Sequence, residues 1–213
     1  MRILYIDTTT SNLYTAIYED NKIVESISSS FGKDLSKVAL DKIKGMLDNQ
    51  GLTPNDIDKF IVVNGPGSFT GIRIGVTLAK TLAYTLNKDI TTISSLQAMA
   101  LSIKDSNEFI VPIIDARRGF VYAAIYDKDG NPILKDQYIS LESLKQACDN
   151  LIGDYSFIGN DIKFDLDYEE YSPDFLKIIE KYKDKENINP HLVNPIYLKL
   201  TEAEENKKQE IIW

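Results

Sequence analysis

The sequence predicts an α/β protein made of two related lobes, each a mixed β-sheet flanked by helices. Short apolar runs alternate with longer segments whose apolar residues recur at helical spacing, which indicates strands followed by helices. A pattern of strand, aspartate, polar loop and strand occurs twice, and 108 residues separate Asp7 from Asp115. The stretch 104–107 between the copies is polar. We therefore expect an internal duplication, with a first lobe over residues 1–105 and a second over residues 106–213.

The duplication depends on six identities that all occur at the same offset. The matched pairs are Ile6 and Ile114, Asp7 and Asp115, Tyr14 and Tyr122, Ala16 and Ala124, Ile17 and Ile125, and Tyr18 and Tyr126. An acidic turn follows both copies. Chance matches a few apolar positions, but six identities at one spacing favour two copies of a strand–hairpin unit.

The elements of the first lobe follow in order from apolar spacing and capping residues. Strands are expected at 3–6, 13–18, 23–28, 60–63 and 90–93, and helices at 35–49, 70–86 and 94–103. Thr53 before Pro54 favours a short helical turn, and Ser94 with Gln97 fits a capping box for the third helix.

The second lobe has fewer clear signals. After its strand–hairpin unit, helices are expected at 141–151 and 175–182, a strand at 157–159 and an extended piece at 194–198. The segment 161–171 is acidic and rich in tyrosine, and the segment 202–209 predicts a charged surface helix or frayed tail.

A glycine-rich stretch at 64–75 connects the strand at 60–63 to the helix at 70–86. Glycines allow a sharp turn there, and Ser68 or Thr70 can cap the helix. The stretch predicts either a tight connection or a phosphate site at the helix N-terminus. It matches neither the P-loop nor the dinucleotide-binding pattern.

The same helix carries a bare stripe, formed by Gly71, Gly75, Ala79 and Ala83 at every fourth residue, with Ile72 and Val76 beside it. Small residues at this spacing let another backbone approach to about 8–10 Å. The stripe therefore packs either on the protein's own sheet or on a second protein.

Composition limits the class of function. The net charge is −8, so the chain has no general attraction for nucleic acid or anionic membranes. The single cysteine, Cys148, fits a reducing compartment and a buried, inert side chain. No apolar stretch reaches the roughly 20 residues of a membrane helix, and no signal peptide is recognised, so we expect a soluble cytoplasmic protein.

Two strand–aspartate–hairpin units resemble the actin-like ATPase and sugar-kinase (ASKHA) architecture, in which phosphate lies between the two hairpins. The weak nucleotide-binding candidates are then Asp7, Thr8, Asp115 and Arg117. Arg117 either clamps an anion or pairs with Asp115. The adenosine-binding Gly-Gly loop of such enzymes is absent from the chain. The only histidine, His191, is expected on the surface or in packing, which leaves no histidine-based metal or triad site.

Four motifs together resemble the bacterial threonylcarbamoyladenosine biosynthesis protein family TsaB. They are Ile6-Asp7-Thr8-Thr9, the block Asn64 to Gly75, Asp115-Ala116-Arg117-Arg118-Gly119 with Val121-Tyr122, and Pro195-Ile196-Tyr197-Leu198. They occur in the family's order and cover nearly the whole chain. The larger paralogue TsaD shares the glycine-rich block but carries a His-x-x-x-His metal motif on its first helix, whereas the helix expected at 35–49 contains no histidine.

The resemblance implies a non-catalytic subunit that binds TsaD and the ATPase TsaE, for threonylcarbamoyl transfer to the tRNA adenosine beside the anticodon. It implies a contact with TsaD through the helices at 35–49 and 70–86, and a homodimer when the partner is absent. ATP and a metal on TsaD would serve the complex, with no cofactor on this chain, and tRNA would be reached only through the complex. The expected partner-binding residues are then Gly71, Ile72, Gly75, Val76, Ala79 and Ala83.

Two other hypotheses remain at this point. The duplicated strand–aspartate unit is also compatible with a stand-alone ATP-dependent phosphotransferase or hydrolase of the actin-like class. A protease would need a nucleophile or a metal set that the residues do not suggest.

Overall fold

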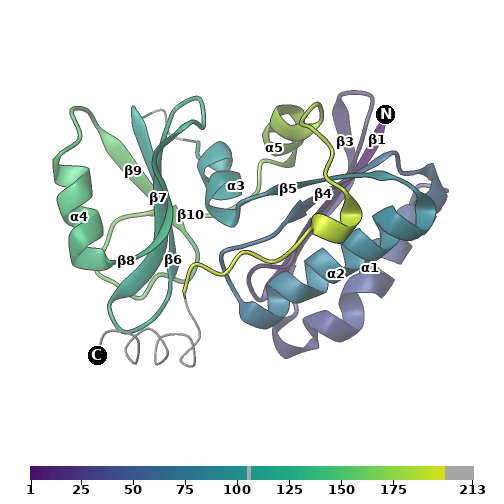
Figure 1. The fold of residues 1–213 in the computed structure, drawn as a ribbon, viewed down its shortest axis with the longest axis horizontal. Coiled ribbons are helices and arrows are strands. Elements are labelled where there is room, and N and C mark those ends of the chain that lie inside the picture. Colours follow the sequence, from purple (N-terminus) through teal and green to yellow (C-terminus); the bar gives the residue numbers. More distant parts are fainter. Residues whose placement is uncertain (105–106, 200–213) are drawn as a thin grey trace.

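The computed structural model describes residues 1–104 and 107–199. Within them, two five-stranded sheets lie next to each other, with two helices between them and the remaining helices on their outer faces (Figure 1). This is the two-lobed α/β fold that the sequence predicts.

The sheet of the first lobe has the order β3-β2-β1-β4-β5. Its strands are β1 (Arg2–Asp7), β2 (Asn12–Glu19), β3 (Lys22–Ser30), β4 (Lys59–Val63) and β5 (Asp89–Ile93). The first three strands pair antiparallel, and β4 and β5 run parallel to β1. Helices α1 (Leu35–Asn49) and α2 (Phe69–Leu86) cover its outer face (Figure 1).

The sheet of the second lobe has the order β10-β9-β6-β7-β8. Its strands are β6 (Phe109–Asp115), β7 (Phe120–Asp127), β8 (Pro132–Ser140), β9 (Tyr155–Gly159) and β10 (Glu169–Glu170). Helix α4 (Leu141–Asp149) covers the outer face of this sheet. Cys148 is buried in that outer core, and burial raises the pKa of its thiol to about 11, as expected for an inert packing residue.

The two sheets are equivalent strand for strand. In each, a meander of three antiparallel strands is extended by two strands parallel to the first. The duplication is therefore confirmed. It also includes β8 and the short β10, which the apolar pattern did not predict.

Helices α3 (Ser95–Ser102) and α5 (Phe175–Tyr182) lie between the sheets (Figure 1). Helix α3 follows the first sheet in sequence but packs on β6, β7 and β9 of the second. Helix α5 follows the second sheet but packs on β1, β2 and β3 of the first. One apolar cluster, here called the shared core, includes Tyr5 of β1, Met99 of α3, Tyr126 of β7 and Ile178 of α5. Each lobe therefore completes the interior of the other.

Polar contacts reinforce this junction. Asp136 of β8 accepts hydrogen bonds from the hydroxyl of Ser94, which precedes α3, and from Tyr126 OH at 2.6 Å. Ser94 also caps α3, since its Oγ accepts from the amides of Leu96 and Gln97. The Gln97 side chain does not complete the expected capping box. It bonds instead to the Gly130 carbonyl and to Tyr182 of α5.

After α5 the chain returns to the first lobe. Lys59 is buried, and its Nζ donates to the carbonyl oxygens of Lys183 at 3.0 Å and Lys185 at 2.6 Å. Residues 190–197, called the C-terminal segment below, then run along α2, where Lys80 Nζ donates to the Val193 carbonyl oxygen at 3.1 Å. The tail helix expected at 202–209 lies outside the described residues.

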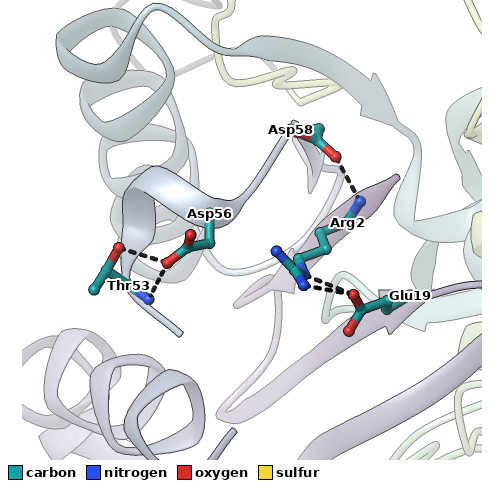
Figure 2. Close-up of polar contacts among 5 residues, drawn as sticks. All are labelled: Arg2, Glu19, Thr53, Asp56 and Asp58. Carbon is teal, nitrogen blue, oxygen red and sulfur yellow. Dashed lines mark hydrogen bonds and ion pairs between the residues drawn. The ribbon is translucent and has the colours of Figure 1, made fainter. Parts of the chain in front are cut away.

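The N-terminus is fixed at the start of β1, the central strand of the first sheet (Figure 2). Arg2 pairs with Glu19 of β2 at 2.7 Å, and its amide donates to Asp58 at 2.8 Å. Nearby, Asp56 accepts from both the amide and the hydroxyl of Thr53, the capping box of a single 3₁₀ turn. These bonds to Thr53 hold the pKa of Asp56 below its usual value.

None of the helices in residues 1–104 and 107–199 combines the length and apolar character needed to cross a bilayer.

Candidate functional site

The first predicted site residues, Asp7 and Thr8, lie where β1 ends in the interior of the first lobe. Asp7 is 1% exposed. Its Oδ1 accepts from Thr9 N at 2.8 Å and from Thr9 Oγ1 at 2.7 Å. Burial raises the pKa of Asp7 from 3.8 to about 6, although the two bonds from Thr9 act in the opposite direction. Asp7 thus organises its own turn.

Three tyrosines surround this carboxylate on the shared-core side. Tyr5 and Tyr171 are buried, and both their hydroxyls lack hydrogen-bond partners among the described residues. Desolvation and the negative charge of Asp7 raise the pKa of both phenols well above their usual value. The third tyrosine is Tyr14, whose hydroxyl accepts a hydrogen bond from the Asn12 side-chain amide at 2.6 Å. The surroundings of Asp7 are thus apolar and offer few hydrogen bonds. Such surroundings disfavour the ionised form of the carboxyl group.

The glycine-rich loop packs directly on the turn that follows Asp7. Thr8 Oγ1 donates to the Gly71 carbonyl at 2.7 Å, and Ser68 N donates to the Thr9 carbonyl at 2.7 Å. A Cβ atom added at Gly67 would collide with the Thr9 carbonyl oxygen, and one added at Gly71 with that of Thr8. The glycines are therefore needed for contact between two backbones of the same chain. This favours the tight connection over the phosphate site.

Helix α2 begins at this loop, and Ser68 is its N-cap, with Oγ accepting from Gly71 N at 3.2 Å. The prediction that its bare stripe faces a partner is wrong. The residues expected to bind a partner are all buried against the first sheet: Gly71, Ile72, Gly75, Val76, Ala79 and Ala83. The small residues let α2 approach β1 so closely that a Cβ at Gly75 would meet Thr8 Oγ1. Hence a larger side chain at Gly75 would damage the fold.

The other nucleotide-binding candidates, Asp115 and Arg117, lie on the second sheet. Asp115 Oδ1 accepts from the backbone amide of Arg117 at 2.7 Å, so the contact between them does not involve the guanidinium. Arg117 and Arg118 both have positive φ, 70° and 55°, and are exposed. This pair stabilises a turn, as Asx motifs do.

The two aspartates of the repeat do not occupy corresponding positions. Asp7 pairs with Tyr14 across its hairpin, whereas Asp115 pairs with Val121, one residue earlier than the repeat predicts. Because side chains alternate along a strand, Asp7 falls on the face of Tyr5, in the shared core, and Asp115 on the face of Ile113, in the outer core. The structure thus places Asp7 next to Thr8 and Asp115 next to Arg117. The Asp7 carboxylate lies on the face of its sheet that points to the shared core, whereas the Asp115 carboxylate lies on the outer face of the other sheet.

The face of α2 that the sequence did not single out is the exposed one. Together with α1 it forms the α1–α2 groove, a hollow of about 570 Å³ with a mainly apolar lining. Its lining residues are Ser36, Ala39, Leu40, Phe69, Thr70, Arg73, Ile74, Thr77, Leu78 and Thr81. Leu40 is 55% exposed and Phe69 is 50% exposed. Exposed apolar side chains gathered in one hollow are typical of interaction surfaces.

A signal for the groove was present in the sequence. Phe69, Ile74 and Leu78 add apolar residues to α2 outside the bare stripe, so the helix is apolar on more than one side. Such a helix contacts something on each apolar side. Ile74 and Leu78 are half-buried against the apolar clusters of the first lobe, whereas Phe69 stays half exposed.

His191, the only histidine of the sequence, is exposed and packs edge-to-face against Tyr84 of α2 with ring centres 4.5 Å apart. Within the described residues there is no group of three or more His, Cys, Asp or Glu side chains placed to hold a metal ion.

Comparisons with known proteins give relatives of named function. The family model described as "TsaD: tRNA N6-adenosine threonylcarbamoyltransferase" matches residues 22–168. The tRNA threonylcarbamoyladenosine biosynthesis protein TsaB of Bacillus subtilis is 33% identical, over 96% of this chain and 96% of its own length. TsaB of Escherichia coli is also 33% identical, over 62% of this chain and 58% of its own length.

Among solved structures, one from Pseudomonas aeruginosa described as similar to the peptidase YEAZ superposes with a TM-score of 0.74. The two chains are 20% identical over 93% of this chain and 99% of the other. A second structure, YeaZ from Pseudomonas aeruginosa, gives a TM-score of 0.71. At this identity the structural similarity establishes the fold.

Proposed function

This chain belongs to the TsaB family of tRNA threonylcarbamoyladenosine biosynthesis proteins, and from that premise we propose that it is the non-catalytic subunit that docks a TsaD-type paralogue through the α1–α2 groove. Its part in tRNA threonylcarbamoyladenosine biosynthesis follows from the family. The proposal concerns how it contributes: by binding the transferase and a TsaE-type ATPase in the cytoplasm, with tRNA reached only through the complex.

The observation that supports the docking face most directly is the exposed apolar groove itself. Helices α1 and α2 have already buried one side each on the first sheet. Leu40 and Phe69 nevertheless remain about half exposed on the opposite side. Burying apolar surface is worth about 25 cal/mol per Å², so a partner that covers this groove gains binding energy there.

A paralogue is the partner that fits this face best. The family model for TsaD covers residues 22–168, which include α1 and α2, so a TsaD-type chain has an equivalent pair of helices. Two such pairs can pack by a near two-fold arrangement, as in an isologous dimer. By the same geometry we expect a homodimer of this chain when the paralogue is absent.

The non-catalytic role is proposed from the chemistry of the residues present. Helix α1 contains no histidine, and the chain has only His191. The turn after Asp7 is filled by the chain's own backbone at the glycine-rich loop, so it does not fit a nucleotide phosphate. We therefore assign ATP and the metal to the partner proteins of the complex.

Leu40→Glu tests the docking face. The substitution places a charge in the middle of the apolar groove, where burial without a partner charge costs roughly 2 kcal/mol, or about 30-fold in Kd. Because Leu40 is already half exposed, the melting temperature should change little. Size-exclusion chromatography and calorimetry with the TsaD-type paralogue measure the effect.

The matched control is Ile133→Glu, since Ile133 is 56% exposed on β8, away from the groove. It should leave the Kd unchanged. If Leu40→Glu binds as tightly as Ile133→Glu, the proposed face is wrong. ATP binding and turnover by the isolated chain would instead support the stand-alone phosphotransferase.

A further inference from the structure

A cluster of three side chains closes one end of the α1–α2 groove. Arg73 and Phe69 come from α2, and Tyr197 comes from the C-terminal segment. The Arg73 guanidinium carbon lies 3.7 Å from the centre of the Phe69 ring and 5.7 Å from that of Tyr197. Arg73 Nε donates to Tyr197 OH at 2.7 Å, and the two rings are 5.1 Å apart. The guanidinium thus lies over the face of Phe69 and is fixed from the side by the Tyr197 hydroxyl.

Tyr197 reaches this place because the C-terminal segment is tied to the loop before α2. Ile196 N donates to the Asn64 carbonyl at 2.8 Å, and Asn64 Nδ2 donates to the Asn194 carbonyl at 3.2 Å. A Cβ atom at Gly65 would collide with the Ile196 carbonyl oxygen, so this loop and the segment are in direct backbone contact. The Pro195-Ile196-Tyr197-Leu198 motif therefore brings an aromatic side chain into contact with Phe69 and Arg73, which line the groove.

The geometry leaves the outer part of the Arg73 guanidinium available. Its Nε is used by Tyr197, while Arg73 itself is exposed and forms no ion pair with any carboxylate of the described residues. An exposed guanidinium whose orientation is fixed through its Nε is a receptor for a carboxylate. Arginine and tyrosine are also the residue types that dominate binding energy at interfaces.

We propose that Arg73 binds a carboxylate of the partner at the end of the α1–α2 groove, and that Tyr197 is a positioning residue that holds the guanidinium for it. This inference rests on the proposed docking face. It adds the chemistry of the partner's contacting residue, an aspartate or glutamate, and a role for the C-terminal segment.

Arg73→Ala, Tyr197→Phe and the double variant test the proposal, with Kd for the TsaD-type paralogue measured at several salt concentrations. Arg73→Ala is expected to weaken binding about tenfold and to reduce the salt dependence of Kd. Tyr197→Phe keeps the ring but removes the hydroxyl, and should weaken binding about threefold. In the double variant the loss should equal that of Arg73→Ala alone, because Tyr197 OH acts through Arg73.

Arg118→Ala, at an exposed arginine of the second lobe, is the control for general charge effects. Equal Kd values for Arg73→Ala and Arg118→Ala would overturn the proposal, as would a tenfold loss with unchanged salt dependence. Additive losses in the double variant would remove the positioning role of Tyr197. If Leu40→Glu abolishes the complex while Arg73→Ala does not weaken it, this inference fails and the docking face stands. If Leu40→Glu has no effect either, both fail.

Discussion

Gly71→Ala is expected to destabilise the protein by about 4 kcal/mol or more, a large share of the 5–15 kcal/mol that keeps a typical domain folded. The new Cβ would overlap the backbone carbonyl oxygen of Thr8. Neither atom moves easily, because Thr8 Oγ1 is also bonded to the Gly71 carbonyl and Ser68 N to the Thr9 carbonyl. Urea unfolding followed by circular dichroism measures the loss.

Gly45→Ala is the matched control, since Gly45 also lies within a helix. Apart from its chain neighbours and the backbone of its own helix, no described atom comes within 4 Å of a Cβ added there. Alanine should stabilise α1 there by about 0.5–1 kcal/mol. If Gly71→Ala were as mild as Gly45→Ala, α2 would not lie against the turn after β1 as described.

Asp7→Asn is expected to stabilise the protein by up to about 3 kcal/mol near pH 8, and the gain should disappear below about pH 4. Folding raises the pKa of Asp7 from 3.8 to about 6. The native state therefore keeps the proton over an interval in which the unfolded chain has lost it. Stability falls as the pH rises through that interval and is constant above it, by roughly 1.4 kcal/mol per pKa unit. Asparagine carries no charge and keeps an oxygen to accept the two bonds from Thr9.

Asp56→Asn gives the opposite sign and serves as the control. Hydrogen bonds from Thr53 lower the pKa of Asp56, so its contribution to stability exists above its unfolded pKa and is lost in acid. Urea unfolding at a series of pH values compares the two variants. A gain for Asp7→Asn that is the same at pH 3 and pH 8, or a loss at pH 8, would show that the buried carboxylate is not the cause.

The sequence was informative where one residue decides a local structure. Ser68 and Ser94 cap their helices as predicted, and the repeated strand–hairpin pattern indicated the two equivalent sheets, although Asp7 and Asp115 do not correspond in register. Strand β8 was missed because Lys135, Asp136 and Gln137 interrupt its apolar pattern. The repeat itself held the missing signal, since β3 of the first copy requires a third strand in the second.

The candidate site was only partly predictable because its decisive contacts are long-range. A stripe of small residues fits close approach to the protein's own sheet as well as to a partner, and only the position of Thr8 against Gly75 distinguishes them. Likewise, a shift of one residue in the pairing of β6 with β7 moves Asp115 to another face, which identity at a fixed offset does not reveal. The contact between Arg73 and Tyr197 is likewise invisible to local patterns, because the two residues are 124 positions apart in the sequence.

The shared core couples the unfolding of the two lobes. Because α3 and α5 are exchanged between the sheets, neither half retains a complete interior if the other unfolds. We expect a single cooperative melting transition with no half-folded species. Because the two sheets share this interior, we expect them to keep their relative position when a partner binds.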